Sequence, residues 1–289
     1  MPNDREQAYA RRFRRVFDYI ERHLQEDLSV ECLCQVAHFS KFHFHRLFAK
    51  FCGVSVSRYI QLLRLKQASQ QLVRQRQRKI IDIALDSGFE TPESFSRAFK
   101  QLFGQTPTAF RCSPDWDTWG RQFCFKTPDR TDHMDVKIIT TPTIKVAVLE
   151  HRASPAHLTD SILRFIEWRK STTLSPVLTS QTFGIAYDDP ETTEPEAFRF
   201  DICGSITADE VPANPQGVIQ KEIPGGRCAV VRHLGSTDRI GESVYYLFRN
   251  WLPGSGEELR NFPVYFEYLN VSAEVPEADK ETDVYLPLK

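Results

Sequence analysis

Residues 93–107 read ESFSRAFKQLFGQTP, a stretch with the pattern of one short helix followed by the start of another. Gly104 predicts the end of the first helix, and Thr106-Pro107 predicts the N-cap and first residue of the second. The polar and basic face of the first helix suits either a solvated surface helix or a helix that enters a DNA groove. Its opposite, apolar face follows the spacing i, i+3, i+4 and i+7, with Phe95, Ala98, Phe99 and Leu102.

An earlier part of the chain repeats this pattern 51 residues before. Residues 41–52 carry the same apolar stripe and end at Gly53, as the later helix ends at Gly104. A shorter predicted helix and a turn precede each stripe, at residues 30–39 and 80–89. The chain therefore carries two copies of a helix-turn-helix.

A long helix is predicted between the two copies, over residues 56–75. At 1.5 Å per residue it would separate them by about 30 Å, and one turn of B-DNA is about 34 Å. One monomer could thus place helices 41–52 and 92–103 in successive major grooves.

The charge of the chain is unevenly distributed. Residues 1–126 hold 21 Lys and Arg against 13 Asp and Glu, whereas residues 127–289 hold 16 against 25. The formal charges are +8 and −9, which sum to the net −1 of the chain. A basic part joined to an acidic part predicts that the first part alone meets a polyanion.

The spaced residues of the second copy resemble the signature of AraC/XylS-type transcription regulators. The motif is IxxIAxxxGF at residues 80–89, followed by FxRxFKxxxGxTPxxFR at residues 95–111. The resemblance covers about residues 10–113 and implies an all-α domain of about seven helices that binds double-stranded DNA. The residues that it implies for contact with bases are Phe42, His45 and Arg46 in the first copy, and Glu93, Ser96 and Arg97 in the second.

The side-chain chemistry favours the first copy for reading bases. Arg46 can donate two hydrogen bonds to guanine, which discriminates by about 1–3 kcal/mol, although an ordinary surface arginine is the alternative. For Arg97 the alternative to base contact is stronger, because Glu93 lies four residues earlier on the helix, where it could form an ion pair with Arg97. Phosphate would repel Glu93, so we expect the second helix to position the protein more than to read sequence.

The remainder of the chain has a different organisation. We assign residues 1–113 to the DNA-binding domain and residues 114–134, rich in Pro, Asp and Thr, to a linker. From residue 135, short apolar runs alternate with helical patterns in the order β-β-α-β-β, twice. This predicts an α+β domain over residues 135–289 with an internal duplication.

An ordered set of short motifs in this part is similar to GyrI-like effector-binding domains. The motifs include IPGG at residues 223–226, FEYLN at residues 266–270 and TDVYLPL at residues 282–288. The order of the two domains resembles that of Rob-type regulators. The resemblance implies a pocket between the two halves of a duplicated sheet, lined by aromatic residues and a buried glutamate. The candidate ligand-binding residues are Glu267, Tyr187 and Tyr285.

Strand alternation predicts which side chains share a face of the strand with Glu267. In an extended strand it shares a face with Tyr265 and Leu269, while Phe266 and Tyr268 point the other way. A carboxylate among aromatic rings needs a positive or hydrogen-bonding partner, and a lipophilic cation could supply one. The alternatives are an exposed or salt-bridged Glu267, and tyrosines that belong to the core.

Targeting and cysteine content favour a cytoplasmic protein. The first 15 residues lack the apolar core of a signal peptide, and no apolar run approaches the ~20 residues that cross a bilayer. The seven scattered cysteines are expected to be reduced thiols, because Cys32 and Cys34 are spaced wrongly for a zinc knuckle or a redox pair.

The functional prediction is a transcription regulator and not an enzyme, with no catalytic residues, no metal and no cofactor. We expect an activator that binds DNA as a monomer, takes a small hydrophobic or cationic effector, works with RNA polymerase and does not bind a membrane. Two alternatives stay open for the GyrI-like domain, which could be a small-molecule hydrolase or a protein-interaction module.

Overall fold

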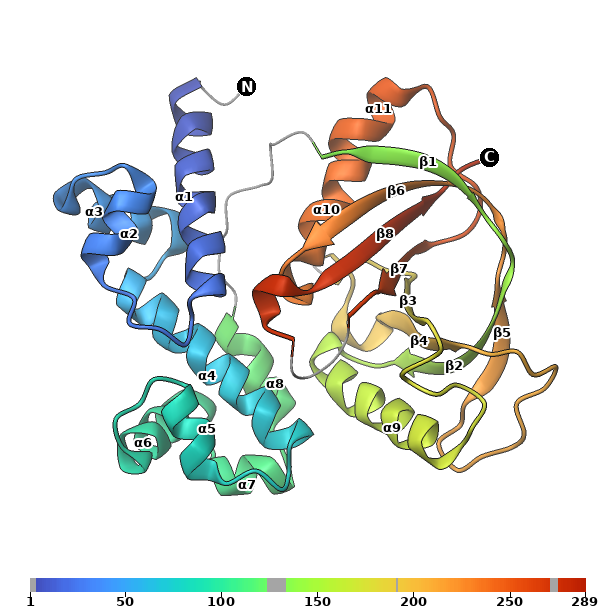
Figure 1. Cartoon of the computed structure of the whole chain (residues 1–289), viewed down its shortest axis with the longest axis horizontal. Coiled ribbons are helices and arrows are strands. Elements are labelled where there is room, and N and C mark those ends of the chain that lie inside the picture. Colours follow the sequence, from blue (N-terminus) through green and yellow to red (C-terminus); the bar gives the residue numbers. More distant parts are fainter. Residues whose placement is uncertain (1–3, 124–133, 191, 271–274) are drawn as a thin grey trace. The chain divides into compact units, whose positions relative to one another are not determined.

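The computed structural model describes residues 4–123, 134–190, 192–270 and 275–289 (Figure 1). The chain divides between Thr131 and Asp132 into two compact units, called here the N-terminal and the C-terminal domain. None of the helices in the described ranges is long and apolar enough to span a membrane.

The N-terminal domain is helical and contains the two predicted helix-turn-helix repeats. The first repeat is α2–α3 and the second is α5–α6, with the long helix α4 between them. The helices are α1 (Asp4–Arg22), α2 (Val30–Ala37), α3 (Lys41–Cys52), α4 (Val56–Arg74), α5 (Ile80–Asp86), α6 (Pro92–Phe103), α7 (Pro107–Cys112) and α8 (Trp116–Gly120), with the short 3-10 helix η1 (Arg121–Phe123).

Side-chain caps explain why these helices begin where they do. Ser29, Ser55, Thr91 and Thr106 each accept a hydrogen bond from a backbone N–H in the first turn of the helix that follows, which satisfies a donor that the helix leaves unpaired. The glycines expected to end α3 and α6 have φ of +76° and +72°, a conformation that glycine adopts without steric cost.

The start of the segment assigned to the linker packs on the N-terminal domain. Trp116 of α8 is buried with its ring 5.3 Å from that of Phe110. Trp119 donates from Nε1 to Ser69 Oγ of α4 at 2.7 Å. Residues 115–123 therefore extend the helical domain beyond α7.

The C-terminal domain is built on an eight-stranded antiparallel sheet in the order β1-β6-β8-β7-β3-β4-β2-β5. Its strands are β1 (Val136–Thr141), β2 (Ile144–Arg152), β3 (Thr182–Ala186), β4 (Arg199–Ser205), β5 (Ile219–Ile223), β6 (Gly226–Leu234), β7 (Val264–Tyr268) and β8 (Glu281–Pro287). Its helical segments are η2 (Pro155–His157), α9 (Leu158–Ser171), η3 (Pro195–Ala197), η4 (Thr237–Arg239), α10 (Ile240–Tyr246), the π-helix η5 (Leu247–Trp251), α11 (Leu252–Ser255) and η6 (Glu277–Asp279).

The predicted duplication is confirmed, and its two halves are related by a constant offset of 82 residues. The start of β2 at residue 144 corresponds to that of β6 at 226, and the starts of α9 at 158, β3 at 182 and β4 at 199 correspond to 240, 264 and 281. The strand order is unchanged when the halves are exchanged and the sheet is read backwards. The halves meet in the middle of the sheet where β3 pairs with β7, and each half also adds its first strand to the other half, where β1 pairs with β6 and β5 pairs with β2.

A buried histidine marks the same place in both halves. His151 Nδ1 lies 2.9 Å from Ser161 Oγ, and its Nε2 lies 3.1 Å from the carbonyl oxygen of Ser154. The matching distances from His233 to Ser243 and Ser236 are 2.9 and 3.0 Å. Each histidine thus ties the end of its strand to the helix that follows.

The sheet has an apolar cluster on each face. On one face, side chains such as Ala147 and Phe266 pack with Phe165 of α9 and Tyr246 of α10. The other face gathers Val148, Phe183, Cys203 and Ile223 with three tyrosines. We call it the tyrosine face, after Tyr187, Tyr265 and Tyr285.

Candidate DNA-binding and effector-binding sites

Helix α3 buries its apolar stripe and exposes two of its three candidate residues. Phe44 and Phe48 are fully buried, whereas His45 and Arg46 are exposed. Arg46 has no ion-pair partner among the described residues, so its guanidinium is available to an outside acceptor. The side chain of Phe42 lies outside the described part of the chain.

Helix α6 has the same arrangement. Phe95 and Phe99 are fully buried, Glu93 and Arg97 are exposed, and Ser96 is half-buried. Among the described residues neither Glu93 nor Arg97 forms an ion pair, so the pairing that spacing allows is not made.

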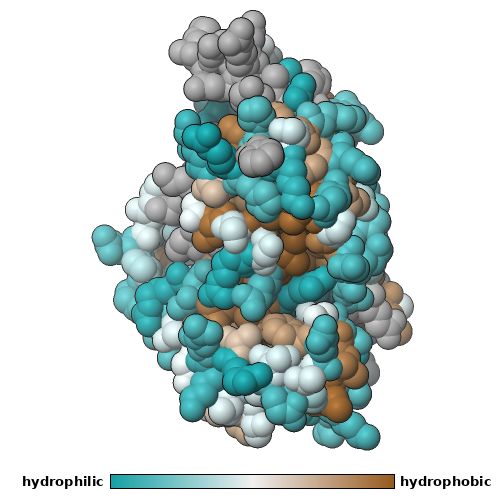
Figure 2. Space-filling model, turned by 90° about the vertical axis from the view of Figure 1, so that its left-hand side faces the viewer, coloured by the Kyte–Doolittle hydropathy of each residue, from teal (hydrophilic) through white to brown (hydrophobic). Residues whose placement is uncertain are grey.

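The side of the molecule on which α3 and α6 lie is largely hydrophilic (Figure 2). Polar residues in teal cover most of the view, and smaller apolar areas in brown lie between them. A surface that meets the phosphates and base edges of DNA needs hydrogen-bond donors rather than one continuous apolar patch.

In the C-terminal domain, Glu267 faces the same side of the sheet as Tyr265, as the alternation predicts. Its Oε2 accepts a hydrogen bond from the Tyr285 hydroxyl at 2.8 Å, and its Oε1 accepts one from Gln181 Nε2 at 2.7 Å. The Tyr285 ring stacks on Tyr265 with centroids 4.6 Å apart. The structure thus brings Glu267 and Tyr285 together beside an aromatic pair.

Both donors to Glu267 are neutral. Burial raises the pKa of the Tyr285 hydroxyl well above its usual value, and the hydrogen bond to Glu267 raises it further. Tyr285 therefore remains a protonated donor at neutral pH. Among the described residues, no cation pairs with the Glu267 carboxylate, which accepts from a phenol and an amide.

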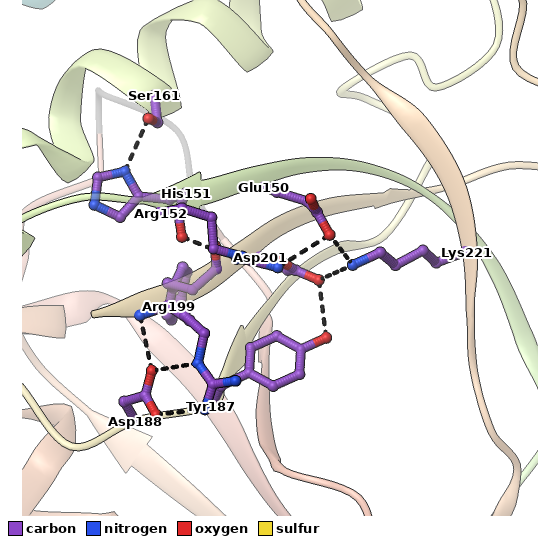
Figure 3. A network of polar contacts seen from close by, with 10 residues as sticks. Glu150, His151, Arg152, Ser161, Tyr187, Asp188, Arg199, Asp201 and Lys221 are labelled. Carbon is purple, nitrogen blue, oxygen red and sulfur yellow. Dashed lines mark hydrogen bonds and ion pairs between the residues drawn. The ribbon is translucent and has the colours of Figure 1, made fainter. Parts of the chain in front are cut away.

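Tyr187 lies in a different cluster, around Asp201 (Figure 3). Its hydroxyl donates to Asp201 Oδ2 at 3.0 Å, and burial followed by the Asp201 charge raises its pKa. Asp201 is fully buried and also has Lys221 Nζ at 2.7 Å and Arg152 Nη1 at 2.8 Å. The structure therefore does not place Tyr187 in contact with the Glu267 carboxylate.

Sequence analysis missed this cluster, which we call the Asp201 cluster: Asp201, Lys221, Arg152, Glu150 and Tyr187. One signal was present, because the run FDICGS places an aspartate in the middle of an otherwise apolar strand. Arg152 comes from β2, which pairs with β4, and Lys221 comes from β5, which pairs with β2. That proximity depends on the sheet order.

The carboxylates on the tyrosine face differ in whether a cation pairs with them. Lys221 contacts both Asp201 and Glu150. Asp283 pairs with Arg232, its cross-strand neighbour. Glu267 differs, because its two hydrogen bonds come from neutral groups.

Comparison with known proteins assigns both domains. Residues 134–289 match the GyrI-like small molecule binding domain, and residues 33–113 match a helix-turn-helix domain. The "Probable transcriptional regulator YgiV" of Escherichia coli K12 is 54% identical over 155 residues, which cover 54% of this chain and 96% of that protein.

Two further similarities cover other shares of the chain. The right origin-binding protein of Escherichia coli K12 is 35% identical over 130 residues, which cover 44% of this chain and 45% of that protein. The solved EcmrR–DNA complex is 14% identical with a TM-score of 0.46, over 86% of this chain and 82% of that one.

Proposed function

Because the chain belongs to the GyrI-like small-molecule-binding family and carries an AraC-type helix-turn-helix domain in front of it, we propose that it is a sequence-specific DNA-binding transcription regulator that responds to a small hydrophobic cation. The observation that supports effector binding most directly is the Glu267 carboxylate, held by two neutral donors beside stacked tyrosines. The name of the YgiV relative, a probable transcriptional regulator, is in keeping with the regulatory role.

The DNA-binding part of the proposal is supported by the two repeats. Each presents an exposed arginine, Arg46 or Arg97, on the side of its second helix opposite buried phenylalanines. Helix α4 has 19 residues, so it spans about 28 Å. That length is close to the pitch of B-DNA, about 34 Å, and would allow both repeats to use one DNA face.

The DNA-binding test is a footprint of the full chain on sites selected from random duplexes. We expect protection over about two helical turns. Arg46→Ala should weaken binding by about tenfold or more and relax the preference at one base pair, because a bidentate arginine–guanine contact contributes about 1–3 kcal/mol. Arg97→Ala should weaken binding to all sites alike. Binding that does not depend on DNA sequence and is unchanged in Arg46→Ala would contradict the DNA-binding part of the proposal.

The effector-binding test is calorimetry with a series of hydrophobic quaternary ammonium ions. Such ions offer a cation to Glu267, whose donor Tyr285 stacks on Tyr265, and they add apolar surface beside this buried aromatic pair. Glu267→Gln keeps the shape but removes the charge, and it should lower affinity by about 30-fold or more. Glu150→Gln is the matched control, because this carboxylate already has Lys221 as a partner, and it should change affinity little. Equal losses in both variants would contradict the proposed site.

Activation, contact with RNA polymerase, binding as a monomer and a cytoplasmic location stay predictions. The hydrolase and protein-interaction alternatives for the C-terminal domain also stay predictions. Loss of compound turnover in Glu267→Gln would favour the first of these, and no heat with any cation would favour the second.

A further inference from the structure

Arg64 lies in the middle of α4, between the two helix-turn-helix repeats. Its Nε donates to the carbonyl oxygen of Leu24 at 2.8 Å, and its Nη2 donates to that of Glu26 at 2.6 Å. Both carbonyls follow the C-terminal end of α1 and precede Ser29, the cap of α2. The guanidinium therefore fixes to α4 the turn by which the chain enters the first repeat.

The same guanidinium lies against the turn of the second repeat. A Cβ placed on Gly88 would be 2.6 Å from Arg64 Nη1 and 2.8 Å from its Cζ. Gly88 also has φ of +72°, in the region that favours glycine. The Arg64 side chain thus bonds to the turn that enters the first repeat and lies close to the turn of the second.

Packing between these segments leaves space around Arg64. A cavity of about 470 Å³ there is lined by Asp27 and Leu28 of the first turn, by Gly88 and Phe89 of the second, and by residues of α4. Since apolar side chains do not fill this space, the Arg64 contacts connect the two repeats where the packing does not.

The chemistry of arginine suits this connection. An arginine side chain ordinarily loses its proton only far above neutral pH, so the guanidinium stays charged at neutral pH although burial lowers the pKa of Arg64. Hydrogen bonds from a charged donor are stronger than those from a neutral donor, and a cation beside the C-terminal end of a helix is favourable. The planar fork also reaches two carbonyls at once, which an ammonium group does less well.

We propose that Arg64 is a positioning residue that holds α3 and α6 at one relative placement, and so restricts binding to DNA sites whose two half-sites are one distance apart. This inference rests on the proposed DNA-binding function. When two binding modules are linked, the second binding event is intramolecular, and its effective concentration is highest when the link matches the span between sites. A rigid link therefore makes affinity depend steeply on spacing, and a loosened link makes that dependence shallow.

The experiment measures affinity against half-site spacing with the full chain. Duplexes selected from random sequence by the native protein are re-made with one or two base pairs inserted between the two protected blocks. The variants are Arg64→Met, which removes the guanidinium, and Arg64→Lys, which keeps the charge without the fork. The control is Arg74→Met, at an exposed position near the end of the same helix.

For the native protein and Arg74→Met, we expect one inserted base pair to lower affinity by about tenfold or more, and for Arg64→Met by about threefold or less. A purely structural role would lower affinity for every spacing equally. If Arg64→Met fails to fold, Arg64→Lys decides, since it should show the same shallow dependence. An unchanged steep dependence in a folded Arg64 variant overturns the inference alone. If the native protein enriches no sequence or protects one block, the proposed DNA-binding mode fails as well.

Discussion

The two halves of the C-terminal domain share a framework but differ in the chemistry of their tyrosine face. His151 and His233 make the same pair of contacts at positions 82 residues apart. At the same offset, Glu267 of β7 corresponds to Ile185 of β3, and Tyr285 of β8 corresponds to Cys203 of β4. The uncompensated carboxylate and its phenol donor therefore occur in the second half, where the first half has apolar residues.

One pair of acidic residues is common to both halves, but its surroundings differ. Asp201 is fully buried with two cations, whereas the side chain of Asp283 is 16% exposed and pairs with Arg232. The two halves thus share the backbone arrangement and the histidine contacts, whereas the side chains of the tyrosine face differ between them. Cations from both halves, Arg152 of β2 and Lys221 of β5, balance the charge of Asp201, whereas Glu267 has no cation partner among the described residues.

The largest expected effect tests the two aspartates against each other. Asp201→Ala leaves Lys221 and Arg152 without a buried carboxylate, and it should lower the free energy of unfolding by about 3 kcal/mol. Asp283→Ala removes a partly exposed pair and should cost about 1 kcal/mol or less. Urea denaturation of the full chain measures both, and equal costs would break the distinction between the halves.

A smaller effect distinguishes the two tyrosine hydroxyls. Tyr285→Phe leaves Glu267 with the Gln181 amide, whereas Tyr187→Phe leaves Asp201 with Lys221 and Arg152. Because a hydrogen bond to a charged group contributes about 1.5–3 kcal/mol, Tyr285→Phe should cost about 2 kcal/mol. Tyr187→Phe should cost clearly less, as the cations remain. Thermal and urea denaturation provide the comparison, and a reversed order would contradict the account of compensation.

The smallest effect concerns the shared histidines and pH. Burial lowers the pKa of His151 below its usual value, so below about pH 6.5 the unfolded chain takes up a proton that the folded chain does not. The free energy of unfolding should therefore fall as pH falls from 7 to 5.5, and one histidine can contribute at most about 1 kcal/mol to this change. His151→Gln should flatten this dependence, which denaturation at several pH values would measure.

The histidine contacts give that experiment its internal control. His233 lies in the matching contacts to Ser243 and Ser236, so His233→Gln and His151→Gln should lower the free energy of unfolding at pH 7 by similar amounts. A change in one variant and not in the other would show that the framework is not equivalent in the two halves.

Several features of the fold follow from short-range pattern. The ends of α2, α3 and α6 could be predicted because a cap or a glycine acts on backbone groups within one helical turn. The orientation of Glu267 could be predicted as well, since alternation in a strand needs no knowledge of neighbouring strands. These are local properties, and the amino-acid sequence alone determines them.

Tertiary structure decided which side chains meet. Glu267 and Tyr187 are both candidate ligand-binding residues by sequence, but the Tyr187 hydroxyl donates to Asp201, because β3 has β7 on one side and β4 on the other. The pairing of β2 with β5 brings Lys221 to Asp201. Arg64 donates a hydrogen bond to the carbonyl oxygen of Leu24, which is 40 residues away in the sequence. Such contacts arise from sheet order and from helix packing between segments that are distant in the sequence. The sequence therefore determines which side chains are available, and the folded arrangement determines which of them meet.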